Sequence, residues 1–232
     1  MIEAVVFDWG GTLSVWVEAD LAEMWRLVAR HLAPDREDEM CALLAAVEER
    51  AWQRSAEDHR SFTLHQLLTE ASTELGLDVE AAVYEEASTH YLDAWTPHIS
   101  HDPDAVAVLH ALHDRGMAVG LLSNTHWPPE YHEHFLERDG LAPLIDARLY
   151  TSQLERTKPH PSVFKLVLDA LGVTDPATAV FVGDRPYDDI SGAKGAGLRA
   201  ILRKGSTVPD HDVEPDAVIA SLPELLPLVD SW

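Results

Sequence analysis

Polar side chains that could carry out chemistry occur at four places, three of them directly after an apolar run. They are Asp8, followed by Trp9, Gly10, Gly11 and Thr12; Ser123 and Asn124; Lys158; and Asp184, Asp188 and Asp189. A carboxylate can act as a nucleophile, and a cation beside it stabilises negative charge that develops in a transition state. Because ligands of open parallel sheets bind beyond the carboxyl ends of the strands, we expect these residues to converge.

The apolar runs predict strands buried on both faces of a sheet, at residues 2–7, 118–122, 179–182 and 198–202. Between them, residues 105–115 and 161–171 have the apolar spacing of helices, and each segment is followed by a glycine that suits a helix end. Strands that alternate with helices indicate an α/β fold, a Rossmann-like doubly wound parallel sheet with helices on both faces.

Residues 16–95 interrupt this alternation, because they contain almost no strand signal. Instead, four amphipathic segments predict helices, at 20–32, 37–57, 64–75 and 79–94. We interpret residues 16–95 as a helical cap domain inserted into a core made of residues 1–15 and 96–232. The insertion begins shortly after Asp8, so it is expected to lie beside that carboxylate. The alternative is a helical subdomain without a role in the chemistry.

The order and spacing of the polar groups resemble the haloacid dehalogenase (HAD) superfamily of aspartate-nucleophile hydrolases. Asp8 matches the first acid of the opening motif D-x-D-G-T-L, Ser123 the second motif and Lys158 the third. Asp184 and Asp189 match the closing motif G-D-x(4)-D. The resemblance covers roughly residues 1–15 and 100–205, and the helical insertion occupies the position of the family's C1 cap.

This resemblance implies a Mg²⁺-dependent hydrolase that acts on a small phosphorylated metabolite through an aspartyl-phosphate on Asp8. Lys158 would bridge Asp8 and the phosphoryl group, and Asp188 would be a solvated neighbour of the metal ligand beside it. The expected ligands of Mg²⁺, which prefers oxygen, are Asp8, the backbone carbonyl of Gly10, Asp184 and Asp189. The expected phosphate-binding groups are Trp9, Gly10, Gly11, Thr12, Ser123, Asn124 and Lys158.

Gly10 departs from the phosphatase pattern, because the second acid of the opening motif is replaced by glycine. In the family, that acid protonates the leaving alcohol and then activates water, and such help is worth about 10²–10⁴-fold. The carbonyl of Gly10 can still bind a metal ion. We therefore expect either a substrate with a good leaving group or another proton donor, for which the candidates are His126, Glu48, Glu49 and His59.

Three alternative functions remain open. The stretch DWGGT resembles the D-W-A-G-T of phosphonoacetaldehyde hydrolases, but those enzymes need a cap lysine, and every lysine here lies at 158, 165, 194 or 204. The 2-haloacid dehalogenases also lack the second acid and use no metal, although their last motif lacks the Gly183-Asp184 pair found here. The third alternative is a catalytically weak phosphate-binding or regulatory module.

Composition restricts the partners more than it selects one. The 232 residues include 40 acidic and 17 Lys or Arg residues, for a formal net charge of −23, which disfavours binding to nucleic acid or anionic lipid. A single cysteine, Cys41, and the lack of a signal-peptide pattern or a long apolar stretch predict a cytoplasmic protein. The oligomeric state does not follow from the sequence, and the residue usage suggests a bacterial source.

Other residues of the insertion and of the region after the second strand carry weaker signals. Arginines on the predicted cap helices could bind a second anionic group of the substrate; these are Arg26, Arg50, Arg54 and Arg60. Tryptophans 16, 25, 52, 95 and 127 are expected in the core or at the cap interface. His132 and His134 are interpreted as surface residues, since side chains two positions apart on a helix point away from each other.

Overall fold

The computed structural model describes residues 1–16, 19–205 and 211–232. In this part of the chain, six parallel strands form one sheet in the order β3-β2-β1-β4-β5-β6, which confirms the predicted doubly wound α/β fold. The strands are β1 (Ala4–Phe7), β2 (Ala118–Ser123), β3 (Ala147–Tyr150), β4 (Ala179–Gly183), β5 (Arg199–Arg203) and β6 (Ala217–Ile219).

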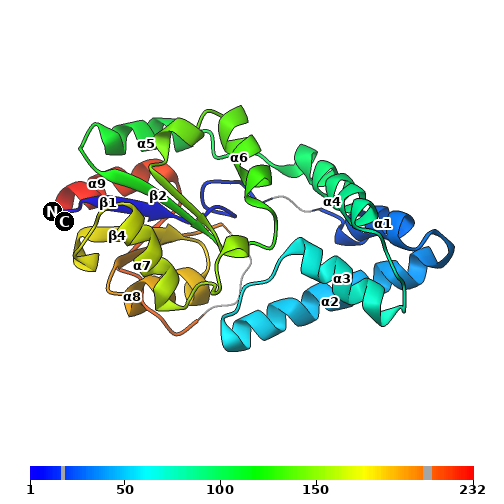
Figure 1. The fold of residues 1–232 in the computed structure, drawn as a ribbon. Coiled ribbons are helices and arrows are strands. Elements are labelled where there is room, and N and C mark those ends of the chain that lie inside the picture. Colours follow the sequence, from blue (N-terminus) through cyan, green and yellow to red (C-terminus); the bar gives the residue numbers. More distant parts are fainter. Residues whose placement is uncertain (17–18, 206–210) are drawn as a thin grey trace.

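Helices cover both faces of the sheet, so the central strands are buried on both sides (Figure 1). In β1, Val5 and Phe7 join one hydrophobic cluster and Ala4 and Val6 join another, and none of these four residues is exposed. This arrangement explains the continuous apolar run of the first strand. The covering helices are α5 (Ala105–His113) and α9 (Leu225–Ser231) on one face, and α7 (Pro161–Ala170) and α8 (Gly192–Gly195) on the other.

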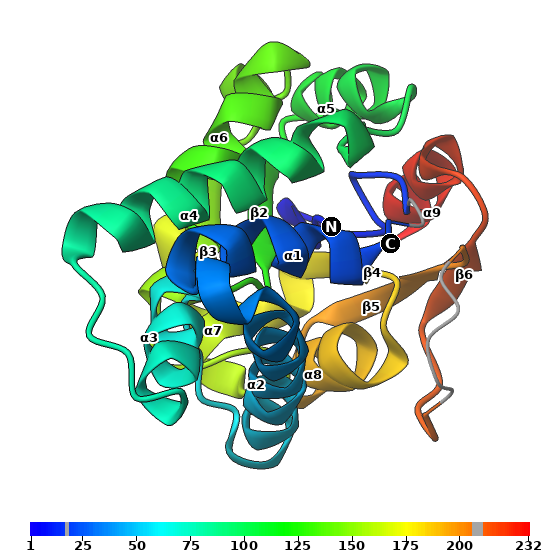
Figure 2. The same ribbon diagram turned by 90° about the vertical axis from the view of Figure 1, so that its right-hand side faces the viewer.

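Four helices between β1 and β2 form the predicted helical insertion, namely α1 (Leu21–Leu32), α2 (Glu37–Asp58), α3 (Leu64–Glu74) and α4 (Ala81–Trp95). They share a hydrophobic cluster of their own, in which the rings of Trp25 and Tyr91 stack with centroids 4.5 Å apart. Figure 1 shows them beyond one end of the sheet, opposite the chain termini, and Figure 2 shows them in front of the strand ends. None of the described helices is both long and apolar enough to cross a bilayer.

The strand order places the ends of β1 and β4 side by side at the point where the topology reverses. From β1 the chain proceeds to β2 and β3 on one side, and it then crosses to β4 on the other side of β1. Phe7 is in register with Val182, and the Asp8 N–H donates a hydrogen bond to the Val182 carbonyl at 2.9 Å. Asp8 and Asp184 therefore emerge next to each other, where ligands of such sheets bind.

The structure contains elements that the sequence did not predict. They include β3, β6, the short helix α8 and a helix after β2, α6 (Pro129–Arg138). The assignment of His132 to the surface was wrong, because this α6 residue is 1% exposed. Its Nε2 lies 3.0 Å from the Thr125 hydroxyl, and its ring stacks on Tyr150 with centroids 4.8 Å apart. His134 is exposed, as expected.

Burial lowers the pKa of His132 to about 3, so protonation of this side chain destabilises the folded protein. The unfolded chain binds a proton near pH 6.5 and the folded chain does not, so the stability conferred by the neutral ring is present above pH 6.5 and is lost as the pH falls. We expect His132→Gln, which can still hydrogen-bond Thr125, to remove about 2 kcal/mol of the stability change between pH 6.5 and 5.

Urea unfolding of both proteins across this pH range measures the difference. His134→Gln on the same helix is the matched control and is expected to keep the wild-type pH dependence, because its ring contacts water in the folded and the unfolded chain. An unchanged pH dependence in His132→Gln would contradict the prediction.

Candidate active site

The predicted catalytic lysine lies in the centre of the site, buried against two carboxylates. Lys158 is 3% exposed, and its Nζ lies 2.6 Å from Asp8 Oδ1 and 2.7 Å from Asp189 Oδ1. Burial lowers the pKa of Lys158, but the carboxylates of Asp189 and Asp8 outweigh this effect and raise the pKa above its usual value. Lys158 is therefore a permanent cation beside the predicted nucleophile.

Asp8 is held at the end of β1 with 6% of its surface exposed. Burial raises the pKa of its carboxyl to about 7; Lys158 lowers the pKa, while Asp189 and Asp184 raise it further. Burial and the neighbouring acids thus both oppose ionisation of Asp8, and Lys158 favours it. A second cation near Asp8 would stabilise its ionised form, which is the form that can act as a nucleophile.

Asp8, Asp184 and Asp189 together fit a divalent cation. All three are buried, and each offers an oxygen within 4.8 Å of the others. With Asp188 included, four carboxylates face two cations, Lys158 and Arg185, so negative charge is in excess in a region of low dielectric, and oxygen ligands suit Mg²⁺. Asp189 also has other partners, because its Oδ2 accepts the Arg185 N–H at 2.9 Å. Gly183 makes room for this carboxylate, since a Cβ there would lie 2.4 Å from Asp189 Cγ.

The turn after β1 is compact and leaves its two glycines in different surroundings. The Trp9 carbonyl accepts hydrogen bonds from the N–H groups of Thr12, at 3.3 Å, and Ser14, at 2.8 Å. Gly11 has φ +75°, and a Cβ there would lie 2.1 Å from Trp16 Nε1, so this position requires glycine. A Cβ on Gly10 would have no atom within 4 Å in the described part of the chain.

Ser123 is the last residue of β2 and Asn124 follows it, so both lie on the other side of Asp8 from β4. Ser123 is 3% exposed and lines the cavity described below. The Asn124 amide makes two hydrogen bonds to the backbone of Lys158, donating to its carbonyl at 3.0 Å and accepting from its N–H at 2.9 Å. Asn124 therefore holds the lysine loop in place, and its contact with phosphate stays a prediction.

A cavity of about 660 Å³ lies between the strand ends and the helical insertion, and it reaches Asp8, Ser123 and Lys158. Of the four candidate proton donors, Glu48 and His126 line this cavity, whereas Glu49 and His59 are not among its lining residues. Glu48 Oε1 lies 3.9 Å from His126 Nε2. Burial raises the pKa of Glu48 and lowers that of His126 to about 3, so in both groups burial disfavours the charged form.

The arginines of the insertion do not face this cavity. Arg26 pairs with Asp38 at 2.8 Å, and Arg50 pairs with Glu74 at 2.6 Å. Arg54 likewise pairs with an acid of α3, and neither it nor Arg60 is a lining residue. The prediction that these arginines bind a second anionic group of the substrate therefore gains no support from their positions.

Three residues near the predicted ligands, Trp16, Arg185 and Asp188, make contacts that the sequence did not predict. The indole Nε1 of Trp16 donates to Asp184 Oδ2 at 2.9 Å, although half of the Trp16 surface is exposed. Arg185 lies 3.7 Å from Asp188, and both line the cavity, so Asp188 is not simply a solvated neighbour. The one available signal was the position of Arg185 between the two acids of the closing motif.

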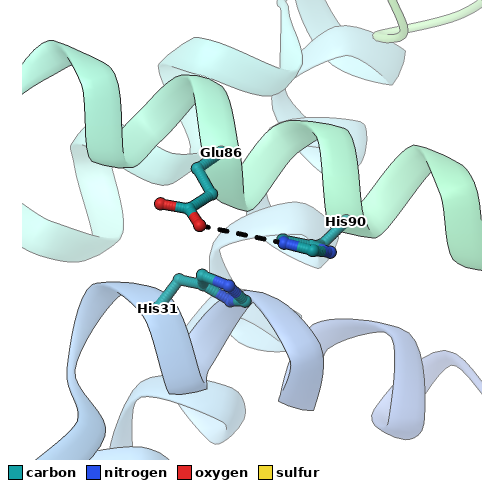
Figure 3. A group of neighbouring side chains, drawn as sticks. All are labelled: His31, Glu86 and His90. Atoms are coloured by element: carbon teal, nitrogen blue, oxygen red, sulfur yellow. Dashed lines mark ion pairs between the residues drawn. The ribbon is translucent and has the colours of Figure 1, made fainter.

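A second group of potential metal ligands lies on the outside of the insertion, on α1 and α4 (Figure 3). The rings of His31 and His90 stack with centroids 4.4 Å apart and planes 25° from parallel, and Glu86 lies 4.0 Å from His90. Nitrogen lone pairs lie in the ring plane, so two nearly parallel rings do not direct them at one ion. His90 and Glu86 are also 48% and 63% exposed. We assign no metal to this group.

Comparisons with known proteins agree with this geometry. The phosphoserine phosphatase of Thermus thermophilus is 35% identical over 124 residues, which cover 53% of this chain and 49% of that protein. The glyceraldehyde 3-phosphate phosphatase of Methanopyrus kandleri is 29% identical over 222 residues, covering 93% and 88%. The match to the first relative thus spans only about half of that protein's length.

Solved structures and a family model extend the comparison to the whole fold. A 2-haloacid dehalogenase from Pseudomonas syringae pv. tomato is 27% identical, with a TM-score of 0.74 and all of both chains covered. The family model described as haloacid dehalogenase-like hydrolase matches residues 2–197, a span that contains Asp8, Ser123, Lys158 and the closing acids. The chain therefore belongs to the haloacid dehalogenase-like hydrolases.

Proposed function

We propose that the protein is a Mg²⁺-dependent phosphatase that hydrolyses a small phosphorylated metabolite through an aspartyl-phosphate on Asp8. The observation that carries this proposal is the buried Lys158 ammonium held between Asp8 and Asp189. A structural protein gains little from burying a lysine among carboxylates, whereas phosphoryl transfer between two anions needs such a cation. The phosphatases among the relatives support the same reaction class.

In the proposed reaction, one group of site residues carries out the nucleophilic attack and the others stabilise negative charge. A carboxylate oxygen of Asp8 would attack phosphorus while Lys158 neutralises charge on the phosphoryl oxygens. Ser123 and the N–H groups of the turn Trp9–Thr12 would bind the remaining oxygens. Mg²⁺ held by Asp8, the Gly10 carbonyl, Asp184 and Asp189, the last directly or through water, would supply further positive charge.

We also propose that residues 16–95 act as a cap over a core of residues 1–15 and 96–232. Support comes from the cavity, whose walls include Glu48, Trp52 and Trp95 of the insertion together with Asp8 and Lys158. Opening would admit substrate and water, and closing would exclude bulk water during attack. The acidic composition and single cysteine favour a small-molecule substrate in the cytoplasm.

A dehalogenase function is the second candidate, because the similarity to the Pseudomonas syringae dehalogenase covers the whole chain and Gly10 lacks an acid. The buried carboxylates of Asp184 and Asp189 favour the metal-dependent reaction instead. Chloride release from 2-chloropropionate in the presence of EDTA would identify a dehalogenase. The phosphonoacetaldehyde hydrolase alternative is weaker, since residues 16–95 contain no lysine.

Asp8→Asn tests the nucleophile. The amide is similar in size to the carboxylate but cannot form the acyl phosphate, so phosphate release from acetyl phosphate should fall by at least about 10³-fold. EDTA should abolish wild-type turnover, and Mg²⁺ should restore it. Asp114→Asn, at an exposed carboxylate of the core, is the matched control and should retain the wild-type rate. Turnover by Asp8→Asn at the wild-type rate would eliminate Asp8 as the nucleophile.

Gly10→Asp tests the missing acid. A Cβ at this position meets no described atom within 4 Å, and Gly10 lines the cavity, so we expect an aspartate side chain to extend into the cavity and protonate the leaving alcohol. We expect kcat/KM for a simple alkyl phosphate to rise by about 10²-fold. Gly10→Ala fills the same space without a carboxyl group and should give no gain. If Gly10→Asp binds Mg²⁺ without any gain, another group already provides the proton, and Glu48 and His126 are then the residues to substitute.

A further inference from the structure

The cavity above Asp8 is walled by aromatic side chains drawn from both parts of the chain. They are Trp9, Trp16, Trp52, Tyr91, Trp95 and Trp127. The rings of Trp95, at the end of α4, and Trp127, after β2, lie 5.2 Å apart, so this wall is continuous from the insertion to the core. Tyr91 is supported from behind by its stacking on Trp25. A volume of about 660 Å³ is in the range of pockets that enclose a ligand of many atoms.

The same wall offers little to a charged substrate group. Among the described lining residues, the lysines and arginines are Lys158, which is occupied by Asp8 and Asp189, and Arg185, which faces Asp188. Both come from the core, and the lining residues of the insertion that are described include the carboxyl group of Glu48 but no lysine or arginine. A carboxylate on the far side of the substrate would therefore lose water without gaining a cation.

The lack of an acid at Gly10 also restricts the substrate, because it favours leaving groups that need no proton. An alkoxide leaves poorly without a proton donor, because simple alcohols are about as weakly acidic as water, with a pKa near 15.7. A phenol resembles the tyrosine side chain, with a pKa of about 10, and its anion leaves without protonation. An enzyme that lacks the acid is thus suited to aryl esters, and an aromatic pocket is suited to the aryl group.

We propose that the substrate is an aryl phosphate monoester whose organic part is an uncharged aromatic ring system bound between the tryptophans. This inference rests on the phosphatase function proposed above. The Asp8 carboxylate forms a bond to phosphorus as the bond from phosphorus to the aryl oxygen breaks, and the phenolate leaves with the electron pair. Water then attacks the aspartyl-phosphate, which regenerates Asp8 and yields inorganic phosphate, and the proton released passes to solvent or to the phenolate.

Two esters with similar leaving groups isolate the contribution of the aromatic wall. Phenol and 2-naphthol have similar acidity, so 2-naphthyl and phenyl phosphate differ chiefly in aromatic area. We expect kcat/KM to be about tenfold higher for the naphthyl ester, because a second ring is removed from water. Phosphoserine and phosphoglycolate, which are charged alkyl esters, should be at least about 10²-fold poorer than phenyl phosphate.

Substitution of the wall provides a second test. In Trp95→Leu the preference for naphthyl over phenyl phosphate should fall to about twofold, because one ring of the aromatic wall is removed. Trp232→Leu, at a tryptophan that packs beside Arg199 away from the cavity, is the matched control and should retain the wild-type preference.

The two proposals fail in different ways. Acetyl phosphate needs neither a proton donor nor an aromatic pocket, so the absence of Asp8-dependent turnover of this compound would overturn the phosphatase function itself. If acetyl phosphate is hydrolysed but phosphoserine or phosphoglycolate matches the naphthyl ester, only the aryl specificity is wrong. Equal kcat/KM for naphthyl and phenyl phosphate in the wild-type protein would also overturn it, even where Trp95→Leu does not fold.

Discussion

The ion pairs of the Lys158 ammonium with Asp8 and Asp189 are the interaction on which the rest of the site depends. Carboxylates buried this completely are tolerated only beside a cation, and the loss of one member of a buried pair leaves the other unpaired at a cost of about 3–5 kcal/mol. Neighbouring residues keep these ion pairs in place. Asn124 fixes the backbone of the lysine loop, and Gly183 leaves space for Asp189.

Topology determines where this charge cluster can form. Because β1 and β4 are neighbours at the point where the strand order reverses, Asp8 and Asp184 leave the sheet together, and the loop after β4 brings Asp189 to the same lysine. The insertion starts within a few residues of Asp8 and returns just before α5, so its helices stand over the strand ends (Figure 1). The core thus presents the reactive groups, and the insertion supplies much of the apolar wall around them.

The sequence contained enough information for the central sheet and for the charged residues of the site, because both leave strong local patterns. Strands buried on both faces appear as unbroken apolar runs, and the acids follow them directly. The elements it did not predict depend on tertiary contacts. In β3, Arg148 pairs with Glu133 of α6, so neither segment shows a simple apolar pattern. The burial of His132 arises from packing that no local spacing reveals. The hydrogen bond from Trp16 to Asp184 joins residues that are far apart in the chain.

The adjacent glycines of the first turn are constrained in opposite ways. At position 11 the left-handed backbone and the nearby Trp16 and Asp184 exclude any side chain, whereas at position 10 the described structure leaves open space. Every glycine codon is one base change away from a codon for aspartate or glutamate. The fold therefore places no barrier in front of an acidic residue at position 10, and the genetic step is minimal. The packing of the turn therefore does not require glycine at position 10, in contrast to position 11.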